Sequence, residues 1–311
     1  MYDDLREIQL LSRLAAFHGA VRTAALCQSR TDRRLVRRLA QDGRLELHPN
    51  RVVAMPGADP SVILCRRIDG VMTCAHAMQF YGLPLQRPPG PLHVAVPAHR
   101  GRLPDGLGRN TVHRVDDLAV PAQEAAPVAC VEHALICFMR CAGELDALIA
   151  IDAALRYGLV RKDDLRSCLS GKRNMSLRAL VDRAHPGARS ILETIARYEL
   201  EEAGYRPFPA IIIEGLGEVD LVLTSHPEDI VLGNQPGTQM LRPGARPALI
   251  VETDGYTYHC RPAQWELDRL RDQSSTACGH LTIRLTGRQV RNHSTVEIIA
   301  PIAEKFGISP G

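Results

Sequence analysis

Carboxylates interrupt two strongly apolar segments in the last third of the chain. Asp220 lies within VDLVL, and Glu252 and Asp254 lie within LIVETDG. Both segments are typical of buried strands, and the two-residue period of a strand places Glu252 and Asp254 on the same face. An unpaired buried carboxylate is costly, so these side chains require a partner. If the strands are neighbours, three carboxylates meet at one edge of a sheet, where their oxygens would favour Mg²⁺ or Mn²⁺.

Further residues of suitable chemistry lie on both sides of this set. Glu193, on a predicted helix before the strands, is placed to complete the cluster. His259, in DGYTYH, can act as a general acid or base or can contact phosphate. Arg271 follows Asp268 by one turn on the next predicted helix and is a candidate phosphate contact. The alternative for Asp268 and Arg271 is an exposed ion pair on the helix surface.

The elements that position these residues follow one another through residues 186–311. Apolar periodicity predicts an α/β domain, a mixed sheet flanked by helices, in which the strands are buried on both faces. The segment 225–247, rich in proline and glycine, is interpreted as a loop and an inserted flap. The predicted helices span 190–205, 262–279 and 294–307, and the predicted strands span 209–214, 218–224, 248–255 and 281–287.

The ordered segments SILE, GEVDLVL, LIVETDGYTYH, ELDRLRD and HLTIRLTGRQV resemble the very-short-patch-repair-like endonuclease domain (DUF559) of the PD-(D/E)XK superfamily. The resemblance implies a restriction-endonuclease-like fold and metal-dependent hydrolysis of DNA phosphodiesters. It assigns Mg²⁺ or Mn²⁺ to Asp220 and Glu252, with Glu193 binding directly or through water. It also places Asp254 at the lysine position of the superfamily motif and His259 at the histidine that closes the repair-endonuclease motif.

The motif lysine is missing from this sequence. Of 38 basic residues only Lys162, Lys172 and Lys305 are lysine, so none lies near the carboxylates in the chain. Another group must therefore assist the attacking water or stabilise charge, and Arg271 is our candidate. The missing lysine also supports a second hypothesis, a non-catalytic DNA-binding regulator or antitoxin with a degenerate nuclease domain. A phosphodiesterase that acts on RNA is a third.

The first 58 residues are interpreted as a winged helix-turn-helix, because helix, helix, arginine-rich helix and hairpin follow in that order. Ser29 or Thr31 can cap the third helix, and Gly43 ends it. Its arginines recur at helical spacing, opposite an apolar face, and could neutralise phosphates of duplex DNA. A solvated helix face is the alternative. The predicted DNA-binding residues are Arg30, Arg33, Arg34, Arg37, Arg38, Arg44 and Arg51.

Residues 59–185 are predicted to form an α+β middle domain, with short strands and turns to about 120, helices over 128–183 and a linker at 183–190. The order of VMTCAHAMQFYGLPL, PLHVAVP, TVHRVDDL and LDALIAIDAALRYGLV after the winged helix resembles the AbiEi-type antitoxin and regulator family, which implies DNA binding. Residues 1–60 carry 10 basic and 7 acidic side chains, 61–185 carry 16 and 12, and 186–311 carry 12 and 16. Residues 1–185 are therefore net basic, whereas residues 186–311, which contain the candidate metal ligands, are net acidic.

Nine scattered cysteines contain no CxxC pair and no histidine at metal-ligand spacing. We expect them to be reduced core residues, without a structural zinc ion. The first residues lack the basic segment of a signal peptide, and no long uncharged apolar stretch occurs. The sequence therefore predicts a cytoplasmic protein that binds DNA and no membrane.

Overall fold

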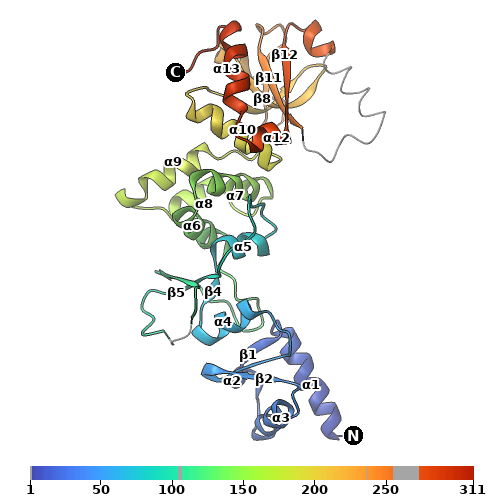
Figure 1. The fold of residues 1–311 in the computed structure, drawn as a ribbon, viewed down its shortest axis with the longest axis vertical. Coiled ribbons are helices and arrows are strands. Elements are labelled where there is room, and N and C mark those ends of the chain that lie inside the picture. Colours follow the sequence, from blue (N-terminus) through green and yellow to red (C-terminus); the bar gives the residue numbers. More distant parts are fainter. Residues whose placement is uncertain (1, 104–106, 236, 255–272) are drawn as a thin grey trace. The chain divides into compact units, whose positions relative to one another are not determined.

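The chain is a mixed α/β protein with mixed sheets flanked by helices, as the sequence predicts, and with one small antiparallel sheet near its start. It forms two compact units, Met1–Gly143 and Glu144–Gly311. The predicted division into 1–58, 59–185 and 186–311 is finer than these units and stays a prediction, and the predicted linker at 183–190 lies inside the second unit. The computed structural model (Figure 1) describes residues 2–103, 107–235, 237–254 and 273–311.

Helices and a small antiparallel sheet form the beginning of the first unit. The sheet order is β1-β3-β2, and residues Ala20–Arg22, between the first two helices, form β1. Leu10, Leu14 and Leu39 are buried together between the helices and the sheet. The elements are α1 (Tyr2–Ala16), β1 (Ala20–Arg22), α2 (Thr23–Leu26), α3 (Arg30–Gln41), β2 (Glu46–His48) and β3 (Val52–Ala54).

The remainder of the first unit combines three helices with a mixed sheet of order β4-β5-β6. Strands β5 and β6 are parallel, and β4 and β5 are antiparallel. Residues predicted as strands and turns include a helix, α4, which Asp59 caps through a hydrogen bond from the Ser61 backbone N–H. The elements are α4 (Pro60–Ile68), β4 (Val71–Met72), α5 (Cys74–Phe80), β5 (His93–Pro97), β6 (Thr111–Val115) and α6 (Val131–Cys141).

A six-stranded mixed sheet of order β12-β11-β8-β7-β10-β9 forms the centre of the second unit. Leu249 and Val251 pack into one cluster with α10 and α13, whereas Ile250 packs into another on the opposite face. The sheet is therefore buried on both faces, as predicted. The helices are α7 (Glu144–Arg156), α8 (Lys162–Ser167), α9 (Met175–Arg183), α10 (Ile191–Glu202), α12 (Gly287–Arg291) and α13 (Thr295–Lys305). The strands are β7 (Phe208–Ile213), β8 (Gly217–Leu223), β9 (Ile230–Leu232), β10 (Gln239–Leu241), β11 (Leu249–Asp254) and β12 (Leu281–Thr286).

The interpretation of 225–247 as a loop and flap is wrong, because this segment contributes strands β9 and β10, which extend the sheet beyond β7. The fully buried carboxylate of Asp229 accepts hydrogen bonds from Arg246, and its Oδ1 lies 2.8 Å from Nε of Arg242. These ion pairs hold the pKa of Asp229 well below its usual range. Charge pairing thus orders a segment whose glycine and proline content suggested a loop.

Within the described residues, the helices lack the length and apolar character needed to cross a bilayer.

Candidate functional site

Four predicted carboxylates lie on three neighbouring elements of the second unit. Glu193 is in the first turn of α10, Asp220 is on β8, and Glu252 and Asp254 are on β11. Strands β8 and β11 are hydrogen-bonded neighbours, and the pairing of Leu221 with Val251 is next to the carboxylates. The condition on which the sequence analysis based the carboxylate cluster, that these strands are neighbours, is therefore met.

Asp220 is bound to the residue between the two acids of β11. Its Oδ2 accepts hydrogen bonds from the backbone N of Thr253 at 2.8 Å and from Thr253 Oγ1 at 3.1 Å. Burial raises the pKa of Asp220, although these two hydrogen bonds oppose the rise. Because neighbouring strand residues point to opposite faces, the Thr253 side chain projects away from those of Glu252 and Asp254. The two hydrogen bonds thus tie the Asp220 carboxylate to the backbone and the side chain of Thr253.

Glu193 is buried beside Asp220. Ser190 caps α10 by accepting a hydrogen bond from the Glu193 backbone N, and Glu193 Oε2 accepts one from the backbone N of Arg189 at 2.8 Å. Burial raises the pKa of Glu193 to about 7, and the charge of Asp220 adds to the rise. The helix cap and the Arg189 N–H together fix where this carboxylate lies.

A buried ion pair fixes α10, the helix that carries Glu193. Arg197 Nη2 lies 2.7 Å from Asp152 Oδ2, and both side chains are 2% exposed. Thr194 Oγ1 donates to the same oxygen at 2.8 Å, and the backbone N of His185 donates to Asp152 Oδ1 at 2.7 Å. Such a pair is costly to break, so α7 and α10 are held together.

Glu252 and Asp254 are half-buried at the end of β11. In the parallel pairing with β12, Glu252 is opposite Arg284 and Asp254 is opposite Thr286. Asp254 is close enough to Asp220 for its charge to raise the pKa of Asp220. Both acids of β11 belong to the strand, as predicted.

The carboxylates are adjacent, but their oxygens do not converge on one point. Among the described residues, only one group of three or more potential metal ligands brings its donor atoms together, and it contains none of these acids. The donor chemistry nevertheless fits a hard cation, because Glu193 and Asp220 are acidic, largely removed from water and close to each other. Glu252 lies one residue from Thr253, which binds Asp220, and could join them.

Two predicted residues, His259 and Arg271, lie outside the described part of the chain, as does Asp268. The structure instead presents Arg189, which sequence analysis did not select. Arg189 forms an ion pair with Glu218 on β8, and its charge favours the ionised forms of Asp220 and Glu193. The available signal was an arginine directly before the capping serine of α10.

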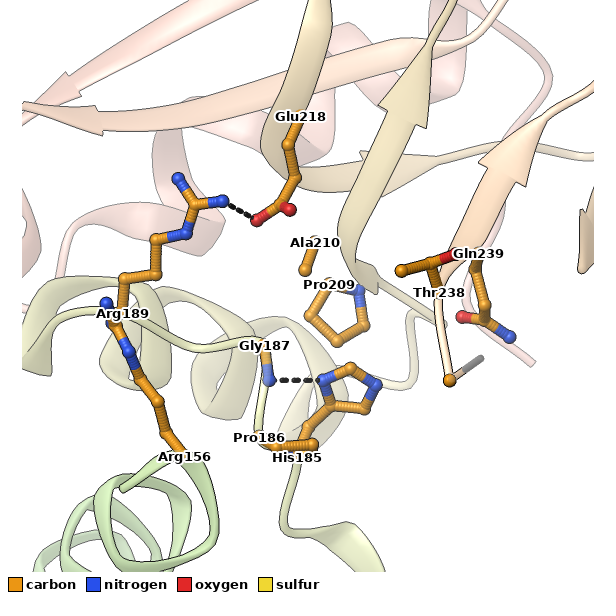
Figure 2. Close-up of a pocket in the computed structure, with 11 residues that line it drawn as sticks. Arg156, His185, Pro186, Gly187, Arg189, Pro209, Ala210, Glu218, Thr238 and Gln239 are labelled. Atoms are coloured by element: carbon orange, nitrogen blue, oxygen red, sulfur yellow. Dashed lines mark hydrogen bonds and ion pairs between the residues drawn. The ribbon is translucent and has the colours of Figure 1, made fainter. Parts of the chain in front are cut away.

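Arg189, whose charge acts on Asp220 and Glu193, also lines a pocket of about 290 Å³ together with Glu218. Figure 2 shows this pair, together with His185, whose Nδ1 accepts a hydrogen bond from the Gly187 backbone N at 3.0 Å. Burial and the nearby charge of Arg197 lower the pKa of His185 to about 4. The pocket thus has basic and neutral polar groups beside the acidic set.

The arginine-rich helix is the main feature of the first unit. Ser29 caps α3 and forms a capping box with Asp32, so the choice between Ser29 and Thr31 is settled in favour of Ser29. Leu35, Val36 and Leu39 are buried, as predicted. The opposite face is basic and exposed and carries Arg30, Arg33, Arg34, Arg37 and Arg38.

The predicted DNA-binding arginines differ in their partners. Glu7 forms ion pairs with Arg38 and Arg44, which reduces their net positive charge. Arg30 and Arg34, by contrast, pair with no carboxylate in the part of the chain that the structure describes. A groove of about 580 Å³ lies between α2, α3 and the β2–β3 hairpin, and its lining includes Arg33, Arg37 and Arg51.

No family model and no curated protein matches the chain. Among solved structures, the crystal structure of the RV2827C protein from Mycobacterium tuberculosis is similar at 19% sequence identity and a TM-score of 0.36. The match covers 75% of this chain and 91% of that chain.

Proposed function

We propose that this protein binds DNA through its first unit and hydrolyses phosphodiester bonds, with Mg²⁺ or Mn²⁺, at the carboxylates of its second unit. The observation that carries the proposal is the position of buried Glu193 beside Asp220, on elements next to the strand that bears Glu252. These residues come from the segments that resemble the DUF559 endonuclease domain. The central mixed sheet with α10 against β8 and β11 supports a restriction-endonuclease-like arrangement.

Each residue of the acidic set has a role in this proposal. Asp220, Glu252 and Glu193 would hold the cation, which when bound would act as a Lewis acid toward phosphate oxygens and would lower the pKa of the attacking water. Arg189, rather than a lysine, stabilises charge on the phosphate, because its guanidinium already acts on Asp220 and Glu193. Asp254, at the position of the motif lysine, keeps negative charge next to Asp220. His259 and Arg271 remain candidates from the sequence.

DNA binding is assigned to α3 and the hairpin after it. The order of helices and the β1-β3-β2 sheet support a winged helix-turn-helix, whose third helix enters the major groove. Exposed arginines on α3 and Arg51 on the hairpin line one groove, as a phosphate-binding surface requires. In this proposal the first unit binds DNA and the second unit hydrolyses the phosphodiester bond.

A nuclease assay tests the proposal. Purified protein is incubated with plasmid, single-stranded DNA and RNA in the presence of Mg²⁺ or Mn²⁺, and parallel reactions contain a chelator. We expect DNA cleavage that the chelator abolishes. Retention of RNA cleavage alone would favour the RNA phosphodiesterase, and metal-independent cleavage would contradict the assigned site.

One observation favours the second function, a DNA-binding regulator or antitoxin without catalysis. Asp220 is bound by Thr253 and does not converge with the acids of β11. With no lysine nearby in the chain, this arrangement is also what a degenerate nuclease domain would show. Specific, salt-dependent DNA binding without cleavage under any of the metal conditions would support this function and exclude the first.

A further inference from the structure

Two cysteines and two histidines from distant parts of the first unit meet at one point. Their donor atoms, one from each residue, all lie within 4.8 Å of one another. They come from the start of α5, the start of β5, the middle of β6 and the end of α6, of which α5, β5 and α6 are labelled in Figure 1. The four residues are Cys74, His93, His113 and Cys141.

Four of the six separations between the donor atoms are close to those of a tetrahedral metal site, and all six are within 4.8 Å. Zn²⁺ at its usual bond lengths sets the ligands apart by roughly 3.8 Å for two sulfurs, roughly 3.5 Å for sulfur and nitrogen, and roughly 3.3 Å for two nitrogens. Cys74 Sγ and Cys141 Sγ are 3.8 Å apart. His113 Nε2 is 3.5 Å from Cys74 Sγ, 3.6 Å from Cys141 Sγ and 3.1 Å from His93 Nδ1.

Hydrogen bonds alone do not account for this arrangement. A neutral imidazole nitrogen either donates one hydrogen or offers one lone pair. His113 Nε2 nevertheless faces two sulfurs and a second imidazole nitrogen. At most one of these contacts can use that nitrogen well, whereas a cation at the centre would bind all four lone pairs.

The backbone provides a second indication at Cys74. This residue has φ of 53°, in the left-handed region that non-glycine residues rarely adopt, and its side chain is almost fully buried. Such a conformation persists where surrounding structure determines it, and it occurs often at functional sites. Here it aims the thiol of the first residue of α5 at the two histidines.

We propose a tetrahedral, structural Zn²⁺ site formed by Cys74, His93, His113 and Cys141. Two thiolates and two imidazoles in a tetrahedron favour Zn²⁺ over the hard cations that the carboxylates would bind. Four protein ligands leave no open coordination position, so the ion stabilises structure and does not activate water. It fastens α5 and α6 to a sheet whose strands contain only two to five residues.

The proposal departs from our expectation of reduced core cysteines without zinc. Among the described cysteines, four are buried and four are exposed, and Cys141 is one of the exposed ones. Successive ligands lie 19 to 28 residues apart, so no short spacing pattern marks them in the sequence. Only the tertiary structure brings them together.

Metal analysis of the full-length protein tests the site. We expect about one equivalent of zinc per chain, retained after dialysis. Substitution by Co²⁺ should give the visible absorption of a tetrahedral, thiolate-bound ion. Wild-type protein with reduced cysteines that binds neither Zn²⁺ nor Co²⁺ would overturn the proposal, as would a Cys74–Cys141 disulfide in protein purified with reductant and zinc.

Variants separate this site from other zinc binding. Cys141→Ser and His113→Ala should each lower zinc affinity more than about 100-fold, because changes outside the ligand set already cost 10- to 100-fold. Cys168→Ser removes another exposed thiol and should retain zinc. Asp220→Asn should also retain it, so failure of the proposed nuclease function leaves this test intact. Wild-type zinc affinity in both ligand variants would refute the assignment.

Discussion

The two units contain different kinds of candidate metal ligand, and the donor atoms lie closer together in the first unit than in the second. In Met1–Gly143, the donor atoms of two thiols and two imidazoles all lie within 4.8 Å of one another, and four of the six separations are 3.1 to 3.8 Å. In Glu144–Gly311, carboxylates occupy neighbouring elements, but their oxygens do not converge. Thiols and imidazoles can approach as neutral groups, whereas ionised carboxylates repel one another and find other donors, such as Thr253. Adjacent acids in a motif therefore do not imply an assembled site.

The largest effect that tests this difference is loss of cleavage in Asp220→Asn. We expect DNA cleavage to fall by about 10²- to 10³-fold, as when a group that stabilises the transition state is removed. Zinc content should stay unchanged, because the cysteine and histidine set belongs to the other unit. Cleavage rates and metal analysis measure the two effects.

Glu214→Gln is the matched control for this change. Glu214 is an exposed acid at the end of β7, outside the proposed site, and its variant should cleave at the wild-type rate. Equal loss of cleavage in both variants would show that cleavage depends on the negative charge of the unit and not on the position of the Asp220 carboxylate.

A pH effect on stability should come from the second unit. The pKa of His185 is about 4 in the folded chain and 6.5 when exposed. Above pH 6.5 the imidazole is neutral in both the folded and the unfolded chain. Between pH 6.5 and 4 only the unfolded chain binds the proton, so the free energy of unfolding decreases as the pH is lowered. The loss attributable to His185 reaches at most about 3 kcal/mol below pH 4.

His185→Asn isolates this contribution. Asparagine can still accept the Gly187 hydrogen bond but does not titrate, so the stability advantage of wild type over variant should decline from pH 6.5 to 4. Denaturant unfolding at a series of pH values measures this difference. A difference that is constant across the range would contradict the assigned protonation.

DNA affinity should depend on the first unit alone. Arg33→Gln with Arg37→Gln should weaken duplex binding about 10-fold and reduce the slope of log affinity against log salt by about 2, one per lost phosphate contact. Arg38→Gln with Arg44→Gln should have a smaller effect, because Glu7 already pairs with both arginines. Titrations at several salt concentrations test this order, and the reverse order would exclude the groove as the DNA surface.

The smallest effect concerns Arg189. We expect Arg189→Gln to slow cleavage about 10-fold, equivalent to one lost hydrogen bond to a charged group. Arg189→Lys should restore part of the rate, because it keeps the charge while losing the planar guanidinium. DNA affinity measured without metal should be the same in both variants. Reduced affinity in both would place Arg189 in DNA binding and not in catalysis.

Sequence patterns predicted the elements that carry local signals. The apolar runs around Asp220 and Glu252 predicted strands β8 and β11, which the structure pairs with each other, and the capping serine and the arginine stripe predicted α3. The patterns failed where order depends on distant partners. Asp229 orders β9 and β10 through ion pairs with Arg242 and Arg246. The proline and glycine content of this segment predicted a loop instead.

The candidate sites show the same limit. The position of Glu193 beside Asp220 followed from motif order, but the hydrogen bonds that turn Asp220 to Thr253 did not. Cys74 and Cys141 are 67 residues apart, so their convergence depends on the packing of α5, α6 and the small sheet. No periodicity in the sequence encodes such a contact.

Anomalous X-ray scattering from a crystal of the full-length protein soaked in Mn²⁺ tests the central claim most directly. Data at the manganese edge should show a peak bounded by Asp220, Glu252 and Glu193, and data at the zinc edge should show a separate peak among the cysteine and histidine ligands. Absence of manganese at the carboxylates, in crystals that admit the ion, would contradict metal-dependent hydrolysis and leave a DNA-binding protein with an inactive nuclease-like unit.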